Sequence, residues 1–178
     1  MKIIDINEKE YPKVLRKIEN PPKKLYVEGD EKILNSNCIA VVGSRKNTKY
    51  GEKWCKKFVK ELVKYDLKIV SGISIGCLVV EAAYRSGTSV TAKFAKDQKR
   101  DVFCIPGSLD NSKSIGTNKL IKDFAKLVTS PEDIIKNYEF LHKIELEKPE
   151  EKEEENEILK LIKEDPINID DIVKLSNK

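Results

Sequence analysis

The sequence is poor in the residues that most often build catalytic and metal centres. Its 178 residues include one histidine, His142, and four cysteines that form no Cys-x-x-Cys pair. Zinc sites usually draw on closely spaced Cys and His ligands, so we expect neither a metal centre nor a cofactor. The cysteines fall in apolar segments and are expected to be core thiols in a reducing compartment: Cys38, Cys55, Cys77 and Cys104.

Long apolar runs are also absent. No stretch approaches the roughly 18 apolar residues of a membrane span, and the first residues lack the apolar region of a signal peptide. These absences predict a cytoplasmic protein with no membrane contact. An apolar content of 39% still permits a buried core, and the length allows one domain plus an appendage.

The charge is unevenly distributed along the chain. Residues 1–140 contain 27 Lys/Arg and 18 Asp/Glu, whereas residues 141–178 contain 7 and 12, for a net charge of +4. A basic body with an acidic tail suits a polyanionic partner. A lysine-rich composition spread over every exposed surface explains the same counts, and charge alone does not choose between the two.

Sequence patterns divide the chain into four parts. Residues 1–35 form an N-terminal segment with a proline-rich turn, and residues 36–140 alternate short apolar runs with amphipathic stretches, which predicts an α/β domain. Residues 141–157 form a glutamate-rich linker, and residues 158–178 resemble the opening of a helix-turn-helix without its third helix.

Within the α/β domain, one connection is unusually short. We expect strands at 67–70 and 77–80, separated only by Ser71 to Gly76. Parallel neighbours normally need a crossover of a dozen or more residues. Either the two strands pair with other partners, or a segment between them is missing.

The first candidate binding feature follows the apolar run Ile39-Ala40-Val41-Val42. Gly43 permits a tight turn, Ser44 can cap it, and Arg45 places a cation at the carboxyl end of the strand. Ligands of open α/β sheets bind at that end, and helix N-termini there favour anions. Alone, this is weak evidence for phosphate binding, because a plain strand–turn–helix connection with a solvated arginine looks the same.

Four separated motifs together resemble the DNA-processing protein A family (DprA, also called Smf). In chain order they are Tyr11-Pro12-x-x-Leu15 with Asn20-Pro21-Pro22-x-x-Leu25-Tyr26; Val41-Val42-Gly43-Ser44-Arg45 with Thr48 and Tyr50-Gly51; Val79-Val80-Glu81-Ala82-x-x-Arg85-Ser86-Gly87-Thr88-x-x-Thr91-Ala92; and Arg100-x-Val102-Phe103-x-Ile105-Pro106-Gly107 with Gly116-Thr117-Asn118-x-Leu120-Ile121.

The resemblance implies a Rossmann-like three-layer parallel sheet followed by a winged-helix appendage, which is partial here. It implies a protein that is not an enzyme, that binds single-stranded DNA during natural transformation, helps to load the RecA recombinase and acts as a homodimer. It assigns DNA or phosphate binding to residues of three loops: Gly43, Ser44, Arg45, Ser86, Gly87, Thr88, Thr91, Gly116, Thr117 and Asn118.

The chain departs from the family pattern in three ways. The long central block that the family carries between its two Ser-Gly stretches is absent after Gly72, as if removed by an in-frame deletion. Lys99 and Phe124 stand where the family has glycine after a helix, and a left-handed residue there is costly without glycine. The winged-helix region is incomplete. These departures predict impaired function.

Two alternatives compete with DNA binding. The first is a non-functional remnant of such a protein, which would fold poorly and expose strand edges. The second is an enzyme resembling a nucleotide phosphoribohydrolase, which needs an acid/base pair beside a phosphate cradle. Glu81 is the one carboxylate within the loop motifs and could equally hold neighbouring loops in place, and His142 lies near the linker.

Overall fold

A five-stranded parallel sheet forms the centre of the molecule. The computed structural model describes residues 1–69 and 72–141, so the predicted linker beyond Leu141 and the partial winged helix lie outside the described residues. The strands stand in the order β4, β3, β5, β6, β7, and every neighbouring pair is parallel. Their bounds are Lys68–Ile69 for β4, Cys38–Val42 for β3, Gly76–Val79 for β5, Asp101–Cys104 for β6 and Lys126–Leu127 for β7.

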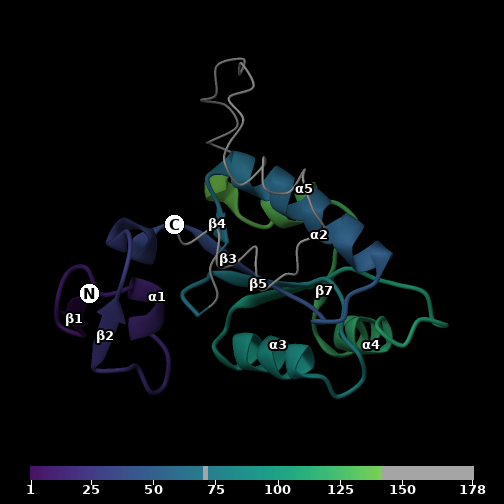
Figure 1. Cartoon of the computed structure of the whole chain (residues 1–178), viewed down its shortest axis with the longest axis horizontal. Coiled ribbons are helices and arrows are strands. Elements are labelled where there is room, and N and C mark those ends of the chain that lie inside the picture. The colour runs from purple at the N-terminus through teal and green to yellow at the C-terminus, as the bar shows by residue number, and fades with distance from the viewer. Residues whose placement is uncertain (70–71, 142–178) are drawn as a thin grey trace, which may run out of the picture.

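Helices cover both faces of this sheet (Figure 1). Helices α2 (Lys49–Leu62) and α5 (Pro131–Ile135) lie on one face, and α3 (Gly87–Asp97) and α4 (Ile115–Asp123) lie on the other. Alternate residues of the buried strands face opposite layers, which gives two separate apolar cores, one under each pair of helices. The predicted three-layer Rossmann-like α/β fold is therefore confirmed for the described part of the chain.

Helix α2 shows why these segments fold as they do. Thr48 caps its N-terminus by accepting a hydrogen bond from the Gly51 amide, 3.2 Å away. Apolar residues spaced three and four apart put Phe58 and Leu62 fully inside the core, while Trp54 packs against its margin. The aromatic row is thus core, as the periodicity predicts, and a short 3₁₀ turn (Val63–Tyr65) ends the helix.

The short connection between β4 and β5 has a topological explanation. The two strands do not pair with each other, because β3 lies between them and pairs with both. The first of the two alternatives drawn from the sequence, pairing with other partners, is confirmed. The link returns beside β3, where the Ile75 amide donates to the Cys38 carbonyl at 2.8 Å, and described residues 72–75 form no helix.

The N-terminal segment is a small unit beside the β4 edge (Figure 1). Strands β1 (Lys2–Asp5) and β2 (Lys24–Val27) pair antiparallel, with the short helix α1 (Lys13–Arg16) between them and a 3₁₀ helix (Glu31–Asn35) leading to β3. Tyr11 is fully buried, and its hydroxyl donates to the Pro22 carbonyl at 2.7 Å. The aromatic residue and the proline turn of the first sequence motif therefore form the centre of this unit.

The two positions that lack the glycine of the family pattern behave differently. Lys99 has a φ of 58°, so the predicted left-handed cap is confirmed there. The prediction is wrong for Phe124, because its φ of −167° is extended backbone that any residue adopts. Its ring lies beneath the Lys96 ammonium, 4.5 Å from the ring centroid, so the aromatic side chain has a packing role that glycine could not fill.

All four cysteines are buried free thiols, as predicted for core residues. Burial raises the pKa of Cys38 to about 11 and the pKa of each of the other three to about 12. Within the described residues, no cluster of His, Cys, Asp and Glu could hold a metal ion. None of the helices described is long and apolar enough to cross a membrane.

Candidate nucleic-acid interface

The three predicted binding loops meet at the carboxyl ends of β3, β5 and β6. The chain leaves β3 for helix α2 on one face and leaves β5 for helix α3 on the opposite face, so the connections diverge between these two neighbouring strands. Such a divergence opens a crevice beyond the sheet, which is the usual ligand site of open α/β folds. We call the surface formed by residues 43–48, 80–89 and 106–118 the carboxyl rim.

The loop after β3 contributes an unneutralised cation. Arg45 and Lys46 are exposed, and neither forms an ion pair with any residue in the ranges 1–69 and 72–141. Gly43 is not among the residues with positive φ, so the tight left-handed turn that glycine permits is not used there. The Gly43 carbonyl instead accepts a hydrogen bond from the Thr88 hydroxyl at 3.1 Å, which ties the first loop to the second.

A buried carboxylate occupies the N-terminus of α2. Glu81 is 1% exposed, and its Oε2 accepts from the Thr48 amide at 3.0 Å while its Oε1 accepts from the Thr48 hydroxyl. A Cβ at Gly51 would collide with this carboxylate, so glycine is required there. A negative charge already sits where the helix amides and dipole would attract a phosphate. The N-terminus of α2 therefore already holds a carboxylate of the protein, and Glu81 ties the loop after β5 to the loop after β3.

The second loop places one of its four predicted residues at the junction. Thr88 faces Gly43, as above, whereas the Ser86 hydroxyl caps α3 by accepting from the Ser89 amide at 3.3 Å. Thr91 donates its hydroxyl to the Gly87 carbonyl at 3.2 Å. Gly87 is exposed, and an added Cβ would meet nothing within 4 Å. Local capping thus accounts for Ser86 and Thr91, and open space surrounds Gly87.

The third loop is mainly structural. Gly116 packs against the second loop so closely that a Cβ would lie 2.5 Å from the Ala82 carbonyl oxygen. Thr117 is 1% exposed and donates to the Ser114 carbonyl at 3.0 Å, so its hydroxyl is engaged within the protein. Asn118 uses both amide atoms on the backbone of Gly107, at 2.8 and 3.2 Å. These three residues shape the carboxyl rim rather than presenting groups from it.

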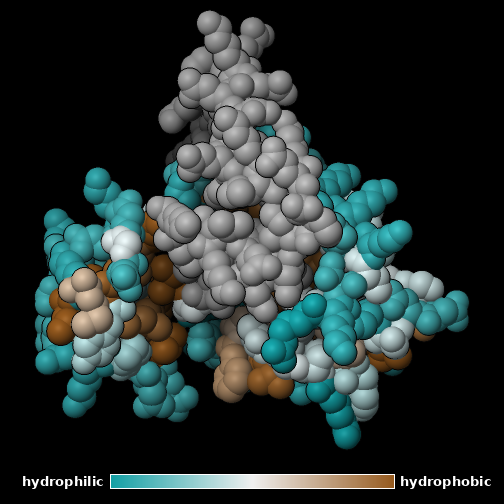
Figure 2. All heavy atoms as spheres, viewed as in Figure 1, coloured by the Kyte–Doolittle hydropathy of each residue, from teal (hydrophilic) through white to brown (hydrophobic). Residues whose placement is uncertain are grey.

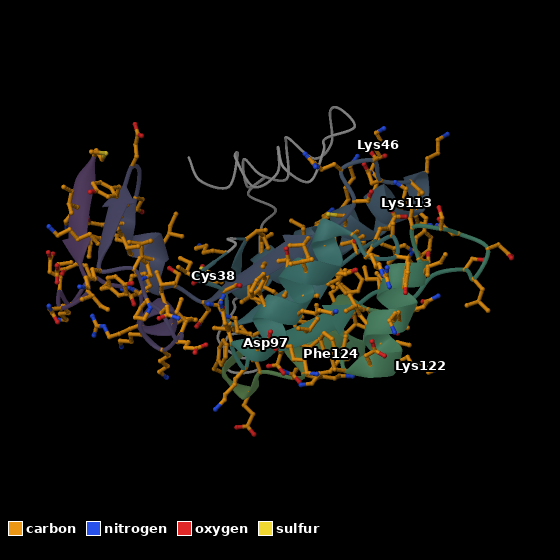
Figure 3. The ribbon with its side chains drawn as sticks, turned by 90° about the horizontal axis from the view of Figure 1, so that it is seen from below. Cys38, Lys46, Asp97, Lys113, Lys122 and Phe124 are labelled. Carbon is orange, nitrogen blue, oxygen red and sulfur yellow. The ribbon has the colours of Figure 1, made fainter. Side chains whose placement is uncertain are left out.

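The sequence motifs do not mark Lys46, and neither do they mark a further cation of the rim, Lys113. Its ammonium donates to the Ser44 hydroxyl at 3.0 Å and also to the Lys46 carbonyl. Its carbonyl accepts from the Ala82 amide at 2.8 Å, so one residue joins all three loops. Figure 3 shows Lys46 and Lys113 close together at the end of the molecule away from the N-terminal unit. The sequence signal that could have indicated Lys113 is its place as a lysine in the polar loop that follows the apolar run of β6.

Hydrogen bonds between its loops fix the rim in place. Tyr50 adds a further tie by donating its hydroxyl to the Pro106 carbonyl at 2.6 Å, and its pKa is raised by burial and then by the nearby Glu81 charge. On the face shown in Figure 2, hydrophilic residues cover the right-hand side, where Figure 1 places the start of α2 and the loop before α4. Cations on loops that hydrogen bonds hold in place can contact an extended anion.

The fold and rim define a class, namely a doubly wound α/β protein with a cationic edge at its topological switch point. Comparison with known families gives the family itself. The sequence matches the model for DNA recombination-mediator protein A over residues 2–77 and 68–139, and the chain belongs to this DprA/Smf family.

Individual relatives agree with the family match. Protein Smf of Escherichia coli K12 is 30% identical over 204 residues, covering 73% of this chain and 54% of that protein. DNA processing protein DprA of Bacillus subtilis is 26% identical and covers 74% of this chain and 69% of that protein. The chain thus spans about half the length of the Escherichia coli relative.

Solved structures share the fold. The X-ray structure of DprA from Streptococcus pneumoniae has a TM-score of 0.72 at 25% identity, covering 78% of this chain and 75% of that one. DNA processing protein A from Helicobacter pylori, whose structure concerns its single-stranded DNA binding mode, has a TM-score of 0.63 at 19% identity, covering 71% of this chain and 91% of that one. The second likeness is evidence for the fold alone.

Proposed function

We propose that this chain binds single-stranded DNA along the carboxyl rim, through the sugar-phosphate backbone. The observation that carries the proposal is the cluster of Arg45, Lys46 and Lys113, whose positive charges meet no ion-pair partner within the described residues. A cationic surface that follows the backbone is the general requirement for single-strand binding with little sequence preference. Membership in a DNA-processing family supports the same assignment.

Arg45 and Lys113 have different roles in this proposal. Arg45 offers its planar guanidinium for paired hydrogen bonds to a phosphate. Lys113 uses two hydrogen bonds to order the loop after β3, and an ammonium carries three protons, which leaves one for a phosphate oxygen. Because Glu81 already occupies the α2 N-terminus, the phosphates contact side chains rather than the amides of that helix.

The proposal includes loss of a central block from an ancestral sequence. The two family matches overlap at residues 68–77, which is the region of the short link before β5. The Escherichia coli alignment runs over 204 positions, whereas 73% of this chain is only about 130 residues. Both facts are expected if the relatives have tens of residues where β4 runs into β5. A smaller binding surface would give weaker binding.

The wider role follows from the family resemblance. We propose that the protein acts in the cytoplasm during natural transformation, forms a homodimer and hands its DNA to the RecA recombinase. A binding role is favoured over catalysis because Glu81, the carboxylate of the loop motifs, is buried and hydrogen bonded to Thr48. The other acid/base candidate, His142, lies outside the described residues.

The proposal is tested by fluorescence anisotropy with labelled oligo-dT at several salt concentrations. We expect binding that weakens steeply as salt rises, because each contacted phosphate releases counterions. Arg45→Gln should weaken binding and flatten the salt slope by about 0.7, the contribution of one single-strand phosphate.

Lys24→Gln is the matched control. Lys24 is exposed on β2 in the N-terminal unit, and its substitution removes the same charge far from the rim. Its slope should equal that of the wild type. DNA affinity that does not change with salt concentration would contradict the assignment of the rim. Equal losses of affinity in Arg45→Gln and Lys24→Gln would contradict it too.

A further inference from the structure

A cavity whose walls do not include Arg45, Lys46 or Lys113 lies between α3 and α4. It has a volume of about 250 Å³, and its walls include Tyr84, Arg85, Lys93, Gly116, Lys119 and Asp123. This volume is below the roughly 300 Å³ of the smallest pockets that enclose a drug-sized ligand. The cavity therefore suits one small group rather than a whole cofactor.

The cavity walls offer two kinds of contact. Tyr84 is 55% exposed, and the Arg85 guanidinium stands 5.2 Å from its ring centroid, so an aromatic ring and a cation are presented together. Lys93 is exposed on the α3 wall, while Lys119 on the opposite wall pairs with Asp123 at 3.3 Å. Three cations against one carboxylate leave the cavity positive.

The cavity is continuous with the rim through a short hydrogen-bonded path. Gly116 lines the cavity and donates its amide to the Ala82 carbonyl at 2.8 Å. The Ala82 amide in turn donates to the carbonyl of Lys113, one of the rim cations. Arg85 holds a φ of 54°, a conformation that is costly for a non-glycine residue, and it lines the same cavity.

We propose that this cavity holds one nucleotide of the bound strand, with its base against the Tyr84 ring and its phosphate beside Arg85 and Lys93. The inference rests on the proposed single-strand binding and adds a base-contacting subsite to it. Stacking on an aromatic ring tolerates every base, which agrees with binding that has little sequence preference. The rim then holds the backbone, while the cavity distinguishes a strand with bases from a bare phosphate chain.

The test compares two probes of equal length and charge: labelled oligo-dT and the same chain with abasic sugars. We expect the wild type to bind oligo-dT at least about fivefold more tightly, the smallest effect expected for one stacked base. Tyr84→Leu should remove this preference and leave abasic binding unchanged, whereas Tyr84→Trp should keep it. Lys93→Gln should weaken oligo-dT binding more than Lys122→Gln, an exposed lysine on α4 outside the cavity.

The outcomes separate this inference from the proposed function. If Tyr84→Leu retains the preference while Arg45→Gln still weakens both probes, the subsite is wrong and the rim assignment stands. If the wild type does not prefer oligo-dT at all, the subsite is likewise wrong. If neither probe binds in a salt-dependent way, the proposed function fails and the subsite fails with it.

Discussion

At the scale of single residues, two positions where the family pattern has glycine differ in whether the backbone needs glycine. Lys99 closes α3 in a left-handed conformation: the Arg100 amide donates to the Ala95 carbonyl at 2.9 Å and the Lys99 amide donates to the Lys96 carbonyl at 2.8 Å. This is the hydrogen-bond pattern of a helix end that usually carries glycine. Lys99 therefore destabilises the fold locally, and Phe124 does not.

Replacing these two residues by glycine should have opposite effects. Lys99→Gly should raise the free energy of unfolding by about 0.5–1 kcal/mol, because the left-handed cost exceeds the added entropy of the unfolded chain. Phe124→Gly should lower it, because its backbone is extended and its ring contacts Lys96. Urea titrations of both variants measure the difference, and a destabilised Lys99→Gly protein would contradict the account.

The buried thiols give a prediction about pH. Burial raises the pKa values of Cys55, Cys77 and Cys104 from about 9 to about 12. A raised pKa in the folded state contributes stability that is complete below pH 9 and is lost as the pH rises towards 12. At pH 8 we expect iodoacetamide to label the folded protein slowly, with Cys38 first because its pKa, about 11, is raised least. Rapid labelling of Cys77 without urea would show that the core is open.

At the scale of elements, the rim depends on how closely α4 approaches the loop after β5. Gly116→Ala would drive a methyl group into the carbonyl oxygens of Ala82 and Ala83. We expect it to lower the free energy of unfolding by about 1–3 kcal/mol, as overpacking does, and to weaken DNA binding by displacing Lys113. Gly87→Ala at the start of α3 is the control, since its Cβ meets nothing and stability should stay level or rise by up to about 1 kcal/mol. Equal decreases in the free energy of unfolding for Gly116→Ala and Gly87→Ala would refute the packing role of Gly116.

The elements of the α/β domain could be predicted from the sequence, because apolar runs and helical periodicity are local signals. Helix α3 begins and ends where the pattern indicates, at Gly87 and Asp97. The order of the strands could not be predicted, because pairing of β3 with both β4 and β5 is set by the whole sheet. For the same reason the sequence could not show which loop residues present their side chains on the rim. Thr117 is buried, whereas Lys113 bonds to Ser44 and Lys46, which lie far from it in the sequence.

At the scale of the whole molecule, the short sheet is closed on both faces. Each face has its own apolar core, and the edge strands β4 and β7 are two residues long, so each edge offers few free backbone groups for aggregation. Both faces are thus packed and both edges are short, unlike the poorly packed remnant with exposed strand edges that the sequence left as an alternative. The carboxyl rim lies at one end of the molecule, and the N-terminal unit lies at the other (Figure 3).

Lysine footprinting of the complex with oligo-dT shows directly whether the DNA lies on the carboxyl rim. The protein is acetylated with and without DNA at low salt, and the modified lysines are identified by mass spectrometry. We expect DNA to protect Lys46 and Lys113, high salt to remove the protection, and Lys24 to react equally in both samples. Protection of Lys24 with Lys46 and Lys113 left unchanged would place the DNA elsewhere and contradict the account.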